Sequence, residues 1–130
     1  MSSAPRRLKI LLIDDSRVAA DFASAVLEST GFEVRTAATL GEFNVVLTTW
    51  SPDVVLTDVN MPGVTGPELC QWIKQRVDTR SVPVVLFSDM PDAQLCKLAE
   101  DAGADAYVSK EHGIERVSAK LSELCEHILW

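Results

Sequence analysis

The stretch VVLTDVNMPG, at residues 54–63, runs from an apolar segment through an acidic residue into a turn. Its first residues are rich in Val and Leu without polar alternation, which is typical of a strand buried on both faces. Comparable apolar runs recur along the chain. The predicted strands cover residues 8–13, 32–36, 53–57, 82–87 and 105–109.

A helix-length segment follows each of these runs. Ser16 is a suitable N-cap for the first helix, and Gly31 is a suitable C-cap. We expect the apolar stripe of this helix to consist of Val18, Phe22, Val26 and Leu27. The other helices are predicted at residues 40–50, 67–77, 91–102 and from 114 to the C-terminus. Five βα units in sequence predict an α/β fold, a doubly wound five-stranded parallel sheet with helices on both faces.

Length and composition place limits on the function. The 130 residues fit one domain, which we expect at residues 8–130 after a disordered leader at 1–7. The net charge of −7 argues against binding to nucleic acid or an anionic membrane, because both need clustered cations. No apolar run is long enough to span a bilayer or to act as a signal peptide, so we expect a cytoplasmic protein. The cysteines lack metal-binding spacing and are expected to be buried free thiols.

Polar side chains stand at the ends of four predicted strands. Asp14 and Asp15 follow the first strand, Asp58 the third, Ser88 the fourth and Lys110 the fifth. Ligands of open parallel sheets bind beyond the carboxyl ends of the strands, so these side chains should converge. Neighbouring carboxylates repel one another unless a cation neutralises them. Because hard oxygen ligands dominate and no His or Cys is near, the expected cation is Mg²⁺.

Each of these residues also has a simpler explanation when it is taken alone. An Asp after a strand is usually a cap or turn residue, a Ser at a strand end is usually a cap, and a Lys is usually a surface charge. His112 and His127, at or in the last helix, are interpreted as surface or helix-end residues. The joint occurrence of the strand-end residues in this order is what favours a site.

Four motifs together resemble the receiver domains of two-component response regulators. They are LLIDDS at residues 11–16, VVLTDVNMPG at 54–63, Ser88, and YVSK at 107–110. The similarity extends over nearly the whole chain from Leu8 onward. The resemblance implies a flavodoxin-like fold with the strand order 2-1-3-4-5.

The resemblance also implies a phosphoacceptor and its metal ion. Asp58 would be the nucleophile that takes up a phosphoryl group. Asp15, Asp58 and the backbone carbonyl of Asn60 would ligate Mg²⁺, and Asp14 would help to hold the ion through water. The ion would neutralise charge on the transferring group.

Further roles carried over from the family concern the response to phosphorylation. Lys110 would pair with a phosphoryl oxygen, and Ser88 would donate its hydroxyl to another. Tyr107 would turn inward when Ser88 moves. Asn60, Asp89 and Met90 border the site and would tune the lifetime of the acyl phosphate. Glu111 stands where the family usually has a proline after a cis bond, and we expect the Lys110–Glu111 bond to be trans.

These residues predict a signalling switch rather than a dedicated enzyme. Asp58 would receive its phosphoryl group from a histidine kinase or a histidine phosphotransfer protein and lose it by slow self-dephosphorylation. The output would be the binding of a downstream protein to the face formed by the last strand and its flanking helices. Two alternatives stay open: a receiver that docks partners without phosphorylation, and a phosphatase of the haloacid-dehalogenase kind. The phosphatase is disfavoured because Asn60 stands where that family needs a second Asp.

Overall fold

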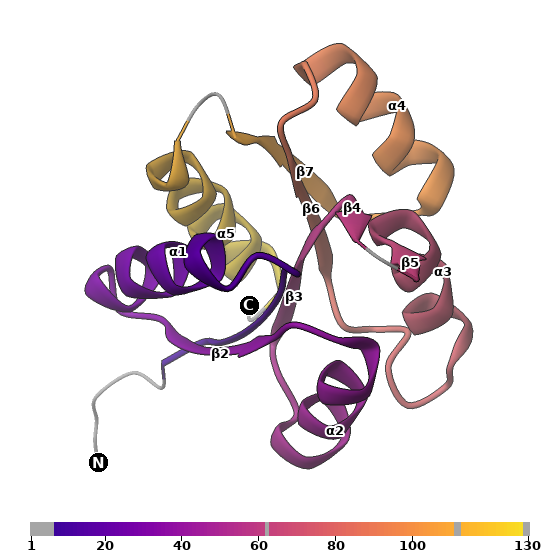
Figure 1. The fold of residues 1–130 in the computed structure, drawn as a ribbon, viewed down its shortest axis with the longest axis horizontal. Coiled ribbons are helices and arrows are strands. Elements are labelled where there is room, and N and C mark those ends of the chain that lie inside the picture. Colours follow the sequence, from indigo (N-terminus) through magenta and orange to yellow (C-terminus); the bar gives the residue numbers. More distant parts are fainter. Residues whose placement is uncertain (1–6, 62, 111–112, 129–130) are drawn as a thin grey trace.

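A computed structural model describes residues 7–61, 63–110 and 113–128, with the backbone alone given at 114 and 124–128. At its centre lies a five-stranded parallel sheet with the order β2-β1-β3-β6-β7 (Figure 1). Its strands are β1 (Lys9–Ile13), β2 (Glu33–Ala37), β3 (Val54–Asp58), β6 (Val84–Ser88) and β7 (Ala106–Ser109).

This order is the flavodoxin-like order 2-1-3-4-5, once two very short strands are set aside. These strands, β4 (Asn60–Met61) and β5 (Val64–Thr65), form a small antiparallel pair directly after Asp58. The sequence did not predict this pair. The predicted fold class and strand order are confirmed.

Within the described residues, five helices cover the two faces of the sheet (Figure 1). One face is packed against α1 (Arg17–Ser29) and α5 (Ile114–Ile128), with Leu27 and Leu121 fully buried between these helices and the strands. The other face is packed against α2 (Leu40–Trp50), α3 (Gly66–Gln75) and α4 (Asp92–Ala102). The apolar strand residues are therefore enclosed on both sides, as their lack of polar alternation predicted.

The ends of α1 follow from local hydrogen bonding. The Ser16 side chain accepts a hydrogen bond from the Ala19 N–H, which confirms the predicted N-cap. At the other end Thr30 is the cap residue itself, and Gly31 follows it with φ +106°. The Phe32 N–H then donates to the Leu27 carbonyl. This arrangement is a Schellman motif, in which glycine supplies the left-handed residue just after the cap.

The predicted apolar stripe of α1 is wrong in part. Val18 and Phe22 are 82% and 64% exposed, whereas Ala20 and Ala23 are buried beside Leu27. Small alanine side chains let the helix backbone lie close to the sheet and to α5. Val18 and Phe22 consequently point to solvent.

Other expectations have mixed outcomes. Cys70 is buried, and burial raises the pKa of its thiol to about 11. Cys96 is partly exposed, which corrects the prediction of a buried thiol, and the Cys125 side chain lies outside the described residues.

Residues 1–6 of the predicted leader also lie outside the described residues. Among the helices that the structure describes, none has the length and apolar character needed to cross a membrane.

Candidate functional site

The three predicted carboxylates lie together at the carboxyl edge of the sheet. Asp14 and Asp15 follow the last residue of β1, and Asp58 is the last residue of β3. One carboxylate oxygen from each lies within 4.8 Å of the others. Asp14 is buried, Asp58 is partly buried and Asp15 is exposed, so the cluster opens to solvent on the Asp15 side.

Backbone N–H groups orient two of these carboxylates. Asp14 Oδ1 accepts a hydrogen bond of 2.9 Å from the Ser16 N–H. Asp58 Oδ1 accepts one of 2.8 Å from the Val59 N–H. The N-cap of α1 and the residue after β3 thus each orient one of the carboxyl groups.

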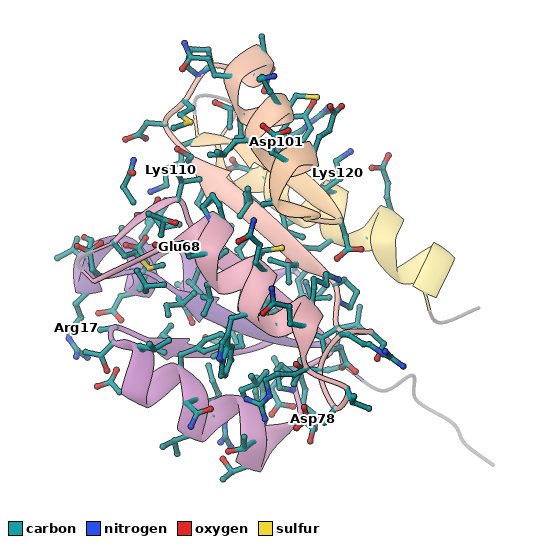
Figure 2. All side chains as sticks on the ribbon, turned by 90° about the vertical axis from the view of Figure 1, so that its right-hand side faces the viewer. Arg17, Glu68, Asp78, Asp101, Lys110 and Lys120 are labelled. Atoms are coloured by element: carbon teal, nitrogen blue, oxygen red, sulfur yellow. The ribbon has the colours of Figure 1, made fainter. Side chains whose placement is uncertain are left out.

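Lys110, directly after β7, brings a positive charge to this cluster. Its Nζ atom lies 3.8 Å from Asp58 Oδ1 and 3.9 Å from Asp14 Oδ2. The same ammonium lies 5.2 Å from the centroid of the Phe87 ring. Figure 2 shows Lys110 and Arg17 toward the left of the view, at the edge of the sheet that carries the site. Asp78 lies farther to the right, toward the opposite edge.

The electrostatics of the cluster act chiefly on Asp58. Burial raises the pKa of its carboxyl group, and the neighbouring Asp14 and Asp15 raise it further. The charge of Lys110 and the Val59 N–H lower the pKa, but the net direction is upward. An additional cation at this point would therefore stabilise the ionised form of Asp58.

Ser88 is the last residue of β6, at the same edge of the sheet as the carboxylates. It is buried, and its Oγ atom accepts a hydrogen bond of 3.2 Å from the Met90 N–H. Of the predicted rate-tuning residues, Asp89 and Asn60 are exposed and Met90 is partly buried. Asn60 belongs to β4, two positions beyond Asp58.

Two residues that support the Asp58 backbone were not predicted as parts of the site. The Thr57 hydroxyl, which is fully buried, donates to the Asp58 carbonyl at 2.9 Å. Gly66, at the start of α3, lies so close that a Cβ atom there would be 2.5 Å from the Asp58 carbonyl oxygen. The sequence does carry one signal of this close helix start, because Thr65 and Glu68 form a capping box around it.

Tyr107 lies on β7 and lines a hollow of about 730 Å³ with residues of α4 and α5. Hydrogen bonding with the Cys96 side chain raises the pKa of the Tyr107 hydroxyl. The tyrosine also packs against the apolar cluster that contains Val59 and Leu95. This cluster connects the residue after Asp58 to the face on which Tyr107 is found.

The remaining predictions fall on parts of the chain that are not described. Glu111 and His112 lie outside the described residues, and so does the Lys110–Glu111 bond. The same holds for the His127 side chain.

Comparisons with known proteins agree with this geometry. A family model described as "Response regulator receiver domain" matches residues 10–122. The gliding motility regulatory protein of Myxococcus xanthus is 33% identical over 93% of this chain and 16% of its own length. The phosphate regulon transcriptional regulatory protein PhoB of Rhizobium meliloti is 28% identical over 89% of this chain and 51% of its own.

A solved structure gives the same result. The signal receiver domain of a signal transduction histidine kinase from Syntrophus aciditrophicus superposes with a TM-score of 0.81 at 28% identity. The match covers 92% of this chain and 91% of that one. The two curated relatives are longer, since this chain spans 16% of one and 51% of the other.

Proposed function

The chain belongs to the response regulator receiver domain family, and from this premise we propose that it is a two-component switch that accepts a phosphoryl group on Asp58. One observation carries the proposal. A single ammonium, that of Lys110, lies within 4 Å of oxygens from both Asp58 and Asp14. A lysine held against a carboxylate cluster is suited to a centre that receives a phosphoryl group.

Asp58 acts as the nucleophile. One of its carboxylate oxygens bonds to the phosphorus of a phosphohistidine or a small phosphodonor, and the bond from phosphorus to the donor atom breaks. Lys110 offsets the negative charge that arrives with the phosphoryl oxygens. Ser88 donates its hydroxyl to another of these oxygens, which its place at the end of β6 supports. Self-dephosphorylation by water is slow, and the domain is not a dedicated enzyme.

The residues present fit a Mg²⁺ ion. Three carboxylates offer hard oxygen ligands within 4.8 Å of one another. Burial, with a smaller effect from the charges of Asp14 and Asp15, raises the pKa of Asp58. Asp15, Asp58 and the Asn60 carbonyl would hold the ion directly, and Asp14 would hold it through water. When bound, the ion neutralises charge on the transferring phosphoryl group.

A histidine kinase or a histidine phosphotransfer protein supplies the phosphoryl group, and the domain works in the cytoplasm. A downstream protein binds the face formed by α4, β7 and α5. The hollow that Tyr107 lines on this face supports the assignment, with Tyr107 turning inward when Ser88 moves. The domain itself does not contact nucleic acid, because its net charge is −7. One relative is named a transcriptional regulatory protein, but it is about twice as long as this chain. The name therefore describes the whole relative and not the matched domain.

Two other functions fit the geometry less well. A receiver that only docks partners has no use for a lysine held between two carboxylates. A phosphatase of the haloacid-dehalogenase kind needs an acid/base two residues after its nucleophile, and the amide of Asn60 cannot transfer protons in that way.

The experiment that separates these functions is intact-mass spectrometry after incubation with acetyl phosphate, with and without Mg²⁺. A switch gains one phosphoryl group in the presence of Mg²⁺ and loses it slowly after the donor is removed. A docking module gains none. A phosphatase consumes the donor over many turnovers.

A further inference from the structure

The backbone of Met90 is held at both of its polar groups by two serines from neighbouring strands. Its N–H donates to Ser88 Oγ at 3.2 Å, and its carbonyl accepts a hydrogen bond of 2.9 Å from the Ser109 hydroxyl. Ser88 and Ser109 are register partners at the ends of β6 and β7. The two hydroxyls and the Met90 backbone therefore form one connected hydrogen-bonded unit.

Ser109 is fully buried, and it stands immediately before Lys110. Successive side chains of a strand point to opposite faces of the sheet. Lys110 reaches the carboxylates, while Ser109 shares the face of Tyr107 and lines the same hollow. Met90 packs against the apolar cluster that Tyr107 also contacts. Ser109 thus directly precedes the lysine of the carboxylate cluster and lies on the same face of β7 as Tyr107.

The loop that Met90 occupies leads directly into α4. The N-cap of this helix is Pro91, whose side chain makes no capping hydrogen bond. The Ser109 hydroxyl donates to the carbonyl of Met90, the residue before this cap. This contact fixes the Met90 peptide units, and with them the N–H group that Ser88 accepts from.

We propose that Ser109 is a positioning residue for Ser88 and acts through Met90. The assignment rests on the proposed function insofar as Ser88 serves the phosphoryl group. Because the Ser88 oxygen accepts from the Met90 N–H, the hydroxyl hydrogen of Ser88 can donate to a phosphoryl oxygen. The direction of that hydrogen depends on where Met90 lies. Removal of the Ser109 hydroxyl frees the Met90 carbonyl and lets both ends of the unit shift.

The first readout is amide hydrogen exchange at Met90, which needs no phosphodonor. In Ser109→Ala the Met90 N–H should exchange roughly fivefold faster, the change expected when one neutral hydrogen bond that holds the loop is lost. Ser109→Thr keeps the hydroxyl and should restore slow exchange. Ser29→Ala is the matched control, because the Ser29 hydroxyl also donates to a backbone carbonyl, that of Val26, on the exposed side of α1. Ser29→Ala should leave the exchange rate of the Met90 N–H unchanged.

The second readout is a double-mutant cycle on the lifetime of the phosphorylated protein. Ser109→Ala should change the lifetime in the same direction as Ser88→Ala and by a smaller factor. In the Ser88→Ala background it should have no further effect, because the hydroxyl that it positions is gone. A purely structural role for Ser109 would instead give the same additional change in both backgrounds.

Unchanged Met90 exchange in Ser109→Ala would overturn the proposal, and so would additive effects in the cycle. If the wild-type protein takes up no phosphoryl group, the proposed function fails. The exchange experiment then still decides whether Ser109 positions Met90, so the two failures are distinguishable.

Discussion

The Lys110 ammonium lies 3.8 Å from Asp58 Oδ1, beyond ordinary hydrogen-bond length but well within Coulombic range. Its charge lowers the pKa of Asp58 against the opposing effects of burial and of Asp14. Lys110 therefore favours the ionised form of Asp58, and only the ionised carboxylate is a nucleophile.

This relationship can be tested by removing the charge while keeping the length of the side chain. In Lys110→Met the pKa of Asp58 should rise further, as followed by carboxyl ¹³C NMR. Phosphorylation by acetyl phosphate should slow by on the order of 10²-fold, the usual loss when a charge facing a transferring group is removed. Lys97→Met removes an exposed charge from α4 and serves as the control. An unchanged Asp58 pKa in Lys110→Met would refute this electrostatic role.

The metal assignment predicts unequal effects of two substitutions. Asp15→Ala removes a proposed direct ligand and should weaken Mg²⁺ binding by roughly tenfold or more. Ser88→Ala removes a hydroxyl that is not a ligand and should leave the affinity nearly unchanged. Calorimetric titration of both variants measures the difference. Equal affinities would show that the ligand assignment is wrong.

The raised pKa of Asp58 predicts how stability depends on pH. Below its ordinary value of 3.8, the carboxyl group is protonated in both the folded and the unfolded state and has no effect. As pH rises through the folded-state pKa, the folded protein must ionise a partly buried group beside other carboxylates, and stability falls. Asp58→Asn should therefore melt higher than the wild type at pH 7 without Mg²⁺, by on the order of 3 °C.

The difference in melting temperature should shrink on acidification and vanish at about pH 3, where wild-type Asp58 is neutral. Thermal melts across this range provide the measurement. Added Mg²⁺ should raise the melting temperature of the wild type more than that of the variant. A variant less stable than the wild type at pH 7 would contradict the sign of the effect.

Gly66 offers a steric test of the backbone behind Asp58. A Cβ atom there would lie 2.5 Å from the Asp58 carbonyl oxygen and 3.1 Å from Val59 Cα, and both atoms belong to the backbone. Gly66→Ala should destabilise the fold by about 1–3 kcal/mol and slow phosphorylation, because the Asp58 loop must shift. Denaturant unfolding and acetyl phosphate labelling measure the two effects.

Gly41→Ala is the matched control for this substitution. The nearest atom to a Cβ there is 3.9 Å away, in a helix. Alanine at that position should stabilise the protein by about 0.5–1 kcal/mol. If Gly66→Ala left the free energy of unfolding unchanged or increased it, the close approach of α3 to Asp58 would have no consequence for the fold.

Much of the fold could be predicted from the sequence because its signals are local. Apolar runs without alternation mark strands buried on both faces, and Ser16 and Gly31 mark the ends of α1. The buried face of α1 was predicted wrongly because hydrophobicity favours Val18 and Phe22 as core residues. The helix instead buries alanines, whose advantage is small size and which a hydrophobic pattern undervalues.

The candidate site could likewise be predicted only in part. The carboxylates and Lys110 stand at strand ends, where parallel topology alone brings them together. Ser109 and Thr57 could not be assigned, because their roles depend on which backbone group each hydroxyl meets across the fold. Local sequence does not encode strand register or hydroxyl direction.

The central claim, that Asp58 is the phosphoacceptor, is tested most directly by locating the modified residue. The protein is incubated with acetyl phosphate and Mg²⁺, the acyl phosphate is trapped by borohydride reduction, and the peptides are sequenced by mass spectrometry. We predict a single reduced residue at Asp58 and its loss in Asp58→Asn, with Asp14 and Asp15 unmodified. Modification at another residue, or none in the presence of Mg²⁺, would contradict the account.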